Sequence, residues 1–356
     1  MNNYKAVLQA ITAALLFGAS APISKLLLGS IDPVPLAAFI YIGSGIGLIL
    51  FKIIERCINK NDVREAPLSK KDIPWLITAV FFGGVVAPII LMSSLKVTPA
   101  STASLLLNFE GVATTLIAAC FFKESVGKRV WFAIVIITLS TTILSWDFSN
   151  QWGFSLGAIG VVIACFCWGI DNNFTGKISL KDPFSIVIIK GIGAGSFSLI
   201  LSLLLKSSFP SIKIIVGAMT LGCFSYGFSI VLFVLALRGL GSARTSALFG
   251  TAPFIGTILS FILFNDMISV TFIVALPLMI IGAILLLKEK HEHEHLHRAV
   301  MHEHRHCHED EHHDHFHEEE IAKDFYHSHV HAHEAIMHSH SHAPDIHHKH
   351  DHNNCN

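Results

Sequence analysis

The amino-acid sequence predicts an all-α integral membrane protein: ten transmembrane helices, arranged as two inverted five-helix repeats and followed by a disordered cytoplasmic tail. Three observations lead to this fold class. Hydrophobic residues make up 52% of the 356 residues and charged residues only 14%, whereas a soluble domain carries about 25% charged residues. A segment of the first half recurs in the second half. All 23 histidines follow residue 290, so the apolar body and the tail differ in chemistry.

Ten apolar runs are long enough to cross a bilayer, for which a helix needs about 20 apolar residues. Turn-forming or charged residues separate the runs, as in Gly29–Pro33. The predicted spans, in chain order, are Lys5–Leu28, Val34–Ile54, Pro74–Leu95, Ala100–Phe122, Arg129–Trp146, Phe154–Thr175, Phe184–Leu205, Ile212–Leu237, Ser242–Phe264 and Val270–Leu287.

The repeat is clearest in two segments of equal length, Leu95–Glu124 and Leu237–Asp266, which match without a gap and both end in an acid. Asp-Pro at the start of the second span also recurs at the start of the seventh. The chain therefore divides into a first repeat, residues 1–148, and a second repeat, residues 150–288. Because five is an odd number of spans, the second copy must enter the membrane inverted relative to the first, as in many secondary transporters.

Lysine and arginine are distributed unevenly over the loops, and cytoplasmic loops carry the excess in membrane proteins. If the N-terminus is cytoplasmic, sixteen of these residues lie at the inner side and four, Lys25, Lys96, Lys206 and Lys213, lie at the outer ends. The sequence therefore predicts a multi-pass protein of the cytoplasmic (plasma) membrane, with both termini in the cytoplasm.

Two motifs indicate a known family. The fourth span reads Ala-Ser-Thr-Ala-Ser-Leu-Leu from Ala100, then Phe109-Glu110-Gly111 and a closing Phe-Phe-Lys-Glu. Its second copy reads Ser-Ala-Arg-Thr-Ser-Ala-Leu-Phe from Ser242, then Ala252-Pro253 and a closing Leu-Phe-Asn-Asp. In these features the chain resembles the EamA-type members of the drug/metabolite transporter superfamily. It departs mildly from the family at Gly111, where proline is usual, and at Asp266, where glutamate is frequent.

The resemblance covers residues 5–288 and implies secondary transport, but it does not specify a substrate. It implies that helices 1–4 and 6–9 surround a central cavity, with helices 5 and 10 at the rim. It further implies that alternating access moves one repeat against the other. A shared fold alone does not fix the function.

Glu110 is the first candidate for the transport site, because it lies near the middle of the fourth span. An ionisable side chain at that depth costs about 2.5–3.5 kcal/mol on insertion scales. It must therefore face a wet cavity, have a partner, or be protonated. We interpret Glu110 as a carboxylate for proton coupling or cation binding. The alternative is an interhelical hydrogen bond that fixes the packing.

The sixth and seventh spans supply further candidates. Asp171, Asn172 and Asn173 are consecutive and cover most of the helix circumference, so at least one is expected to face inward. Asp171 is expected either to bind a substrate amine or to pair with Lys190, which lies too deep in its span to reach the interface easily. Trp168 and Tyr226 are candidates for lining the cavity, although aromatic residues in spans usually serve packing.

The tail, residues 289–356, carries histidine at alternate positions, as in His-Glu-His-Glu-His-Leu-His from His291. This spacing brings several imidazoles within reach of one ion, and imidazole suits Zn, Ni, Co and Cu without distinguishing them. The composition builds no core, so we expect disorder until a metal binds. The alternative is a polar tail that responds to pH. The candidate ligands are His291, His293, His295, His297, His302, His304, His306, Cys307, His308, His312, His313, His315, His317, His327, His329, His331, His333, His338, His340 and His342.

Two functions follow as hypotheses. The first is a secondary transporter, expected to export a small organic metabolite or drug, with proton coupling as an option. The second is a transporter of divalent Ni, Co or Zn with the tail as metal collector or sensor, which the absence of histidine from the spans disfavours. The chain has no ATP-binding phosphate loop, and we expect neither enzymatic activity, nor a required cofactor, nor nucleic-acid binding. Its oligomeric state is open, with a homodimer as one candidate.

Overall fold

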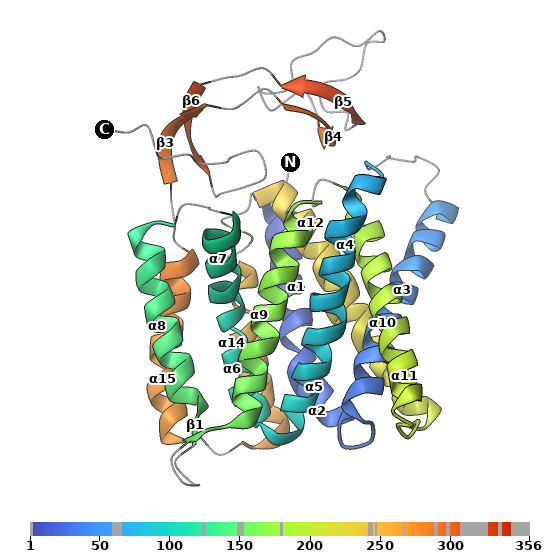
Figure 1. Ribbon diagram of the computed structural model, residues 1–356, viewed down its shortest axis with the longest axis vertical. Coiled ribbons are helices and arrows are strands. Elements are labelled where there is room, and N and C mark those ends of the chain that lie inside the picture. The colour runs from blue at the N-terminus through green and yellow to red at the C-terminus, as the bar shows by residue number, and fades with distance from the viewer. Residues whose placement is uncertain are drawn as a thin grey trace.

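The computed structural model describes residues 3–58, 66–122, 126–147, 153–178, 181–240, 245, 248–266, 268–287, 291–296, 300–306, 327–333 and 337–342. These residues form a bundle of membrane-length helices with short strand pairs above and below it (Figure 1). The helical body is therefore the membrane domain that the composition predicts.

Eight helices in the described part of the chain are long and apolar enough to cross a membrane. They are Tyr4–Leu27, Pro33–Cys57, Lys70–Val97, Ala100–Phe122, Lys128–Ser145, Leu156–Gly176, Pro183–Leu204 and Ile212–Ala236. Two shorter apolar helices, Ala252–Phe264 and Val270–Leu286, follow where the ninth and tenth spans are expected. Of the ten expected spans, eight are therefore present at full length in the described residues, and the ninth and tenth are represented there by these two shorter helices.

Several spans consist of more than one element. The elements of the first repeat are α1 (Asn3–Gly18), α2 (Ser20–Leu27), α3 (Pro33–Ile58), the 3₁₀ turn η1 (Lys70–Asp72), α4 (Ile73–Ala79), the π-helix η2 (Val80–Val86), α5 (Ala87–Val97), α6 (Ala100–Leu106), α7 (Phe109–Phe122) and α8 (Lys128–Ser145). The second repeat contains α9 (Leu156–Gly176), α10 (Pro183–Leu204), α11 (Ile212–Gly222), the π-helix η3 (Cys223–Phe228), α12 (Ser229–Leu240), α14 (Ala252–Phe264) and α15 (Val270–Leu287).

The two repeats start from opposite faces of the bundle. The N-terminus lies on the upper face in Figure 1, whereas the strand pair of β1 (Trp146–Asp147) and β2 (Gly153–Phe154), which leads into α9, lies on the lower face. The strands of the tail lie on the upper face again. The structure therefore has the inverted arrangement that the odd number of spans per repeat requires.

The repeats interlock rather than standing side by side. From the first repeat, α1 packs against α12 and α14 of the second repeat, and α3 packs against α10 and α11 of the second repeat. In the second repeat, α9 packs against α5 and α7, and α15 packs against α8. The first span of each repeat therefore packs against the third and fourth spans of the other repeat. Helices α8 and α15 form a pair at one edge of the bundle (Figure 1).

A glycine permits each of these first-helix contacts. A Cβ atom on Gly169 of α9 would lie 2.9 Å from the backbone nitrogen of Thr114, and one on Gly18 of α1 would lie 2.5 Å from the backbone oxygen of Ala252 in α14. Both contacts are too close for a side chain, so these helices approach each other through bare backbone. Gly18 and Gly169 occupy matching positions in the two repeats, so the inverted symmetry extends to the packing.

The internal breaks of the spans follow the same symmetry. The fourth span is interrupted at residues 107–108, between α6 and α7, and the ninth is interrupted at residues 250–251, in front of α14. Likewise η2 and η3 lie in the third and eighth spans at nearly the same repeat offset. Breaks and π-helical turns are common at functional sites, and discontinuous helices surround the binding sites of many transporters.

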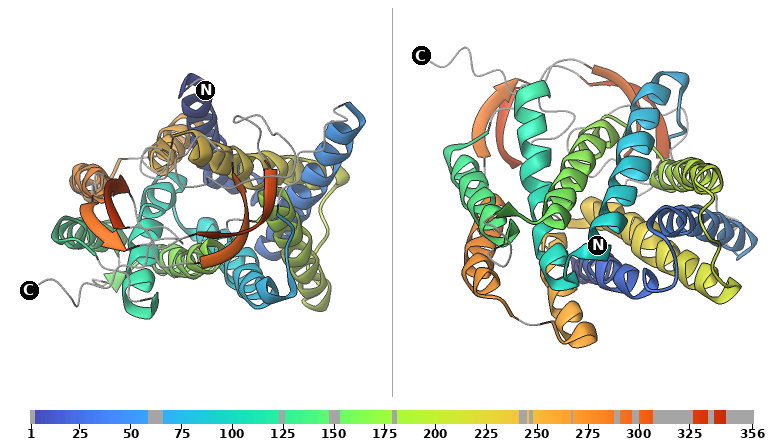
Figure 2. Two further views of the ribbon diagram at one scale, coloured as in Figure 1. Left: turned by 90° about the horizontal axis from the view of Figure 1, so that it is seen from above. Right: turned by 60° about the horizontal axis from the view of Figure 1, so that its bottom comes forward.

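The tail differs from the expected disorder. Strand β3 (His291–Leu296) pairs antiparallel with β6 (Met337–His342), and β4 (Val300–His306) pairs antiparallel with β5 (His327–His333). The physical reason is the alternation itself, because His-x-His has the two-residue period of a strand. Seen from above, these strands extend over the helical bundle (Figure 2).

Candidate functional site

The break in the fourth span sets the position of Glu110. The side-chain amide of Asn108 donates to the carbonyl of Leu105 at 3.0 Å, and the N–H of Glu110 reaches back only three residues, to Leu107, at 3.1 Å. A new helix, α7, therefore begins at Phe109 within the span, and Glu110 lies in its first turn. A carboxylate is favoured there, because the first N–H groups of a helix have no intrahelical acceptor.

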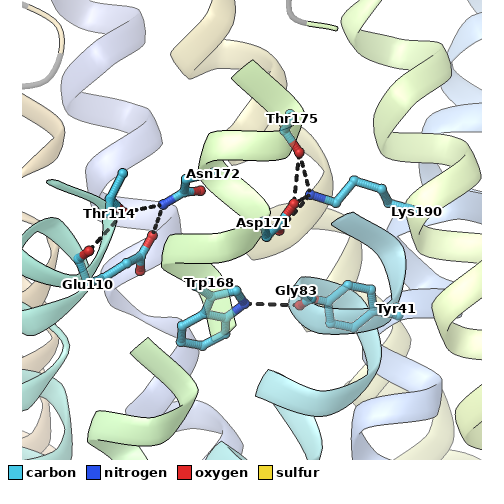
Figure 3. Close-up of polar contacts among 9 residues, drawn as sticks. All are labelled: Tyr41, Gly83, Glu110, Thr114, Trp168, Asp171, Asn172, Thr175 and Lys190. Atoms are coloured by element: carbon cyan, nitrogen blue, oxygen red, sulfur yellow. Dashed lines mark hydrogen bonds and ion pairs between the residues drawn. The ribbon is translucent and has the colours of Figure 1, made fainter. Parts of the chain in front are cut away.

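Glu110 meets neutral partners. Asn172 of α9 donates from Nδ2 to the carboxylate of Glu110 at 2.8 Å and to the hydroxyl of Thr114 at 3.1 Å (Figure 3). Thr114 in turn donates to the backbone carbonyl of Glu110 at 2.8 Å. Glu110 is half-buried and Asn172 is exposed. Within the described residues, no lysine or arginine forms an ion pair with Glu110.

Asp171 lies on the opposite flank of α9 and is paired with a cation. Its two carboxylate oxygens lie 2.6 Å and 2.7 Å from Nζ of Lys190 on α10 (Figure 3). Thr175, one helical turn further along, donates to Asp171 at 2.8 Å. The side chains of Asp171 and Lys190 are 8% and 13% exposed. The pairing that the sequence offered as one alternative for Asp171 is therefore present.

A third polar contact lies below these two, at the carbonyl of Gly83 in η2. In a π-helix the carbonyl bonds five residues ahead, and the N–H of Ala87 donates to Phe82 in this way. The next residue, Pro88, has no N–H, so the Gly83 carbonyl has no donor within its own helix. The hydroxyl of Tyr41 at 2.8 Å and the indole N–H of Trp168 at 3.0 Å supply the missing donors (Figure 3).

Gly83 also makes room for the ion pair. A Cβ atom at this position would overlap the carboxylate of Asp171. Glycine is therefore required where η2 passes α9, and the carboxylate packs directly on the backbone of η2. Trp168 and Asp171 thus belong to one assembly in which α3, η2, α9 and α10 meet.

The remaining predicted residues have structural contacts. Asn173 donates to the backbone carbonyls of Thr114, at 3.0 Å, and Gly169, at 2.8 Å. Tyr226 of η3 is buried, and its ring lies 5.9 Å from that of Phe17 and 5.5 Å from that of Tyr41. Both residues therefore join helices across the two repeats.

The candidate metal ligands of the tail fall in two groups. The backbone is described for the histidines within β3, β4, β5 and β6. Seven candidate ligands lie outside the described residues, namely His297, Cys307, His308, His312, His313, His315 and His317. Among the residues whose side chains are described, which exclude those of the tail, no three His, Cys, Asp or Glu side chains form a cluster suited to a metal ion.

Sequence reasoning missed four members of this site: Tyr41, Gly83, Thr114 and Thr175. Two of them had a readable signal, because Thr114 follows Glu110 and Thr175 follows Asp171 by one helical turn, where side chains meet. Gly83 has the weaker signal of a glycine pair shortly before Pro88. Tyr41 has no local signal, because its partner is a backbone atom 42 residues away.

Two cavities of the bundle lie away from the charged residues. One of about 710 Å³ lies between α14 and α15 and is lined mainly by apolar side chains, including Phe254, Phe261 and Phe272. Another of about 240 Å³ lies between α3 and α11. Neither includes Glu110 or Asp171 in its lining.

The face opposite the N-terminus is held closed by polar contacts. Asp266, which follows α14, accepts from the hydroxyl of Ser101 at 2.7 Å and from its backbone N–H at 3.2 Å. Lys25 of α2 donates to the carbonyl of Thr98 at 2.8 Å and to the carbonyl of Leu95. These contacts tie α6 to the residues after α14, and α2 to the C-terminal end of α5.

Comparison with known proteins agrees with this architecture. The EamA-like transporter family matches residues 4–146 and again residues 155–288. The chain belongs to the EamA-like transporter family. The EamA repeat thus occurs twice, and membrane transport of a small molecule is the function that the family supports.

Two similar proteins illustrate the family assignment. An uncharacterized transporter of Methanothermobacter thermautotrophicus is 29% identical over 275 residues, which cover 73% of this chain and 79% of that protein. A protein crystal structure aligns with a TM-score of 0.57 at 18% identity, covering 79% of this chain and 94% of that chain. The structural likeness establishes a shared fold for the helical body.

Proposed function

We propose that this EamA protein is a proton-coupled secondary transporter that exports a small organic metabolite or drug from the cytoplasm by alternating access. The observation that carries the proposal is Glu110: a carboxylate at a helix break within the membrane whose described partners are neutral. A soluble substrate and a proton would both reach it from an aqueous cavity between the repeats.

Protonation chemistry supports this role for Glu110. An ionised carboxylate in the membrane needs a cation or water, since an unpaired charge there costs about 2.5–3.5 kcal/mol. The amide of Asn172 can hold the side chain in either state, because it leaves the second carboxyl oxygen free to carry a proton. Glu110 can therefore alternate between binding a proton and binding the cationic group of a substrate, which is the exchange that coupled export requires.

The carboxylate of Asp171 cannot exchange a proton for a substrate cation in this way. Lys190 occupies both of its oxygens and is itself nearly buried. The pair stays charged and fixed, and it supports α9 while Glu110 changes state. The carboxylate that changes charge in this proposal is therefore Glu110 on α7, and the fixed ion pair joins Asp171 of α9 to Lys190 of α10.

The contacts at the two faces support alternating access. On the face opposite the N-terminus, α6 packs on α14, and Ser101 binds Asp266. The second half of the same span, α7, packs on α9 and α8 instead. The fourth span thus diverges from α14 beyond its break, which is the geometry of a carrier closed on one face and opening toward the other.

We also propose that both termini are cytoplasmic, which makes the closed face the outer one. The excess of lysine and arginine in the loops on the N-terminal side supports this orientation. Reporter fusions after residue 290 and within residues 147–153 test it. A phosphatase fusion should be active only at the second position, and activity at the first would contradict the orientation.

The function is tested in liposomes that contain the purified protein and a trapped pH-sensitive dye. Amino acids, nucleosides, sugars and cationic drugs are added one at a time, with Ni²⁺, Co²⁺ and Zn²⁺ in parallel. The proposal expects proton movement in response to an organic solute. The second candidate, divalent metal transport, is favoured by the histidines of the tail and would be shown by proton movement in response to the metals alone.

A further inference from the structure

The register of the two strand pairs in the tail places histidine opposite histidine. In the first pair, His291 lies opposite His342, His293 opposite His340 and His295 opposite His338. Three further pairs occur in the second sheet, where His302, His304 and His306 lie opposite His331, His329 and His327. A shift of one residue in either sheet would set every histidine opposite a different residue type.

Strand geometry turns this register into two separate grids. Alternate residues of a strand lie on the same face of the sheet, so the histidines of each strand share a face. Directly opposed residues have Cβ atoms about 4.5–5.5 Å apart. Each sheet therefore has six paired histidines on one face, which in the second sheet also carries Val300 opposite His333. The other face carries glutamate, serine, arginine and apolar residues.

Coordination chemistry then fixes the class of ligand. Zn²⁺ in a closed site takes four ligands in a tetrahedron, and imidazole is one of its usual ligands. Two neighbouring histidine pairs of one sheet supply four imidazoles. We infer that the tail holds two independent sites for divalent transition metal, one on the histidine face of each sheet, each taking one ion.

The nesting of the strands makes metal binding and folding interdependent. The inner sheet of β4 and β5 lies within the segment that β3 and β6 enclose. Two-stranded sheets are marginally stable in water, and ions that bind the folded form stabilise it. Since α15 ends at Leu287 and β3 begins at His291, occupancy of the outer sheet also fixes the tail close to the last helix.

Zn²⁺ binding to the full-length purified protein tests this inference, with a chain ending at residue 290 as the baseline. The full chain is expected to bind two more high-affinity ions than the baseline. The variant His293→Gln/His340→Gln and the variant His304→Gln/His329→Gln should each retain one. The matched control Glu294→Gln/Ser339→Ala, a directly opposed pair on the other face of the first sheet, should retain both.

The decisive variant is His293→Gln/His329→Gln, which removes one histidine from each sheet. It should weaken both sites by at least about tenfold, because even the loss of an outer-shell partner of a metal ligand costs about 10–100-fold in affinity. His293→Gln/His340→Gln instead leaves one site at wild-type affinity. An equal, graded loss for every pair of substituted histidines would overturn the inference, because that result describes an unpaired tail that binds metal without register.

Discussion

The Nζ atom of Lys190 lies within 2.7 Å of both carboxylate oxygens of Asp171, nineteen residues earlier in the chain. On the opposite flank of α9, the side-chain amide of Asn172 donates to the carboxylate of Glu110 from α7. No lysine or arginine of the described residues pairs with Glu110. The two acids of the site are therefore not equivalent. Asp171 is held in an ion pair, whereas the partners of Glu110 in the described residues are neutral.

Substitution of one partner of the ion pair should destabilise the protein strongly. Asp171→Asn leaves Lys190 buried without its counter-charge, which typically costs about 3–5 kcal/mol. The double variant Asp171→Asn/Lys190→Met removes both charges and should recover most of the loss. Thermal unfolding of the purified protein in detergent measures both effects. A double variant as unstable as the single one would contradict a structural role for the pair.

The same double variant separates the two interpretations of Asp171. If the pair only supports α9, the double variant should transport like the wild type once it is folded and inserted. If Asp171 binds a substrate amine, transport should be lost despite recovered stability. The structure favours the first result, because Lys190 already occupies both carboxylate oxygens.

The Gly83 carbonyl should show strong non-additivity between its two donors. Tyr41→Phe alone is expected to cost less than about 1 kcal/mol, because Trp168 still satisfies the carbonyl. In a Trp168→Phe background the same change leaves a buried acceptor without a donor and should cost about 1–3 kcal/mol. Tyr4→Phe is the control, because Tyr4 of α1 is 78% exposed. Equal costs of Tyr41→Phe in both backgrounds would contradict this account.

Asp182 should make stability depend on pH at the N-terminal face. Burial raises the pKa of this carboxyl, but hydrogen bonds from Lys52 and Ser185 outweigh it, so the pKa lies below the ordinary 3.8. A lowered pKa contributes stability above the ordinary value and loses it as the pH falls through the folded-state value. The difference in unfolding temperature between wild type and Asp182→Asn should therefore be constant near neutral pH and shrink below about pH 4.

The control for this prediction lies at the matching position of the first repeat. Asp32 precedes α3 as Asp182 precedes α10, but its ion pair with Lys96 is exposed on both sides, at 47% and 42%. Exposed pairs contribute about 0–1 kcal/mol, so Asp32→Asn should have a small effect at every pH. A large loss in Asp182→Asn that does not change with pH would contradict this charge effect.

The sequence was sufficient for the repeated helical body and insufficient for its irregularities. The match of Leu95–Glu124 with Leu237–Asp266 predicted two related repeats, because apolar length and repetition are visible in residue order. It did not predict the interruption at residues 107–108 or its copy at residues 250–251. A break depends on a few backbone hydrogen bonds, and the apolar composition is the same on both sides.

The π-helices were missed for a similar reason. One extra residue in a helical turn changes no composition, and only Pro88 marks the place where a helical donor is absent. For the tail, low apolar content argued for disorder until a metal binds, whereas the two-residue period of its histidines matches the four short strands that are described. In the site, Glu110, Asp171 and Lys190 were predicted because charged residues are rare in spans. Gly83 was not predicted, because it contributes a backbone carbonyl and the absence of a side chain.

The most direct test of the account is the variant Glu110→Gln, which holds the side chain permanently neutral, compared with Glu55→Gln, the same change at an exposed glutamate near the end of α3. In liposomes with a pH gradient, Glu110→Gln should lose substrate movement driven by the gradient. The exchange of labelled for unlabelled substrate should also weaken, because the neutral amide cannot pair with the cationic group of the substrate. Glu55→Gln should behave like the wild type in both. Gradient-driven transport by Glu110→Gln at the wild-type rate would contradict the central role of this carboxylate.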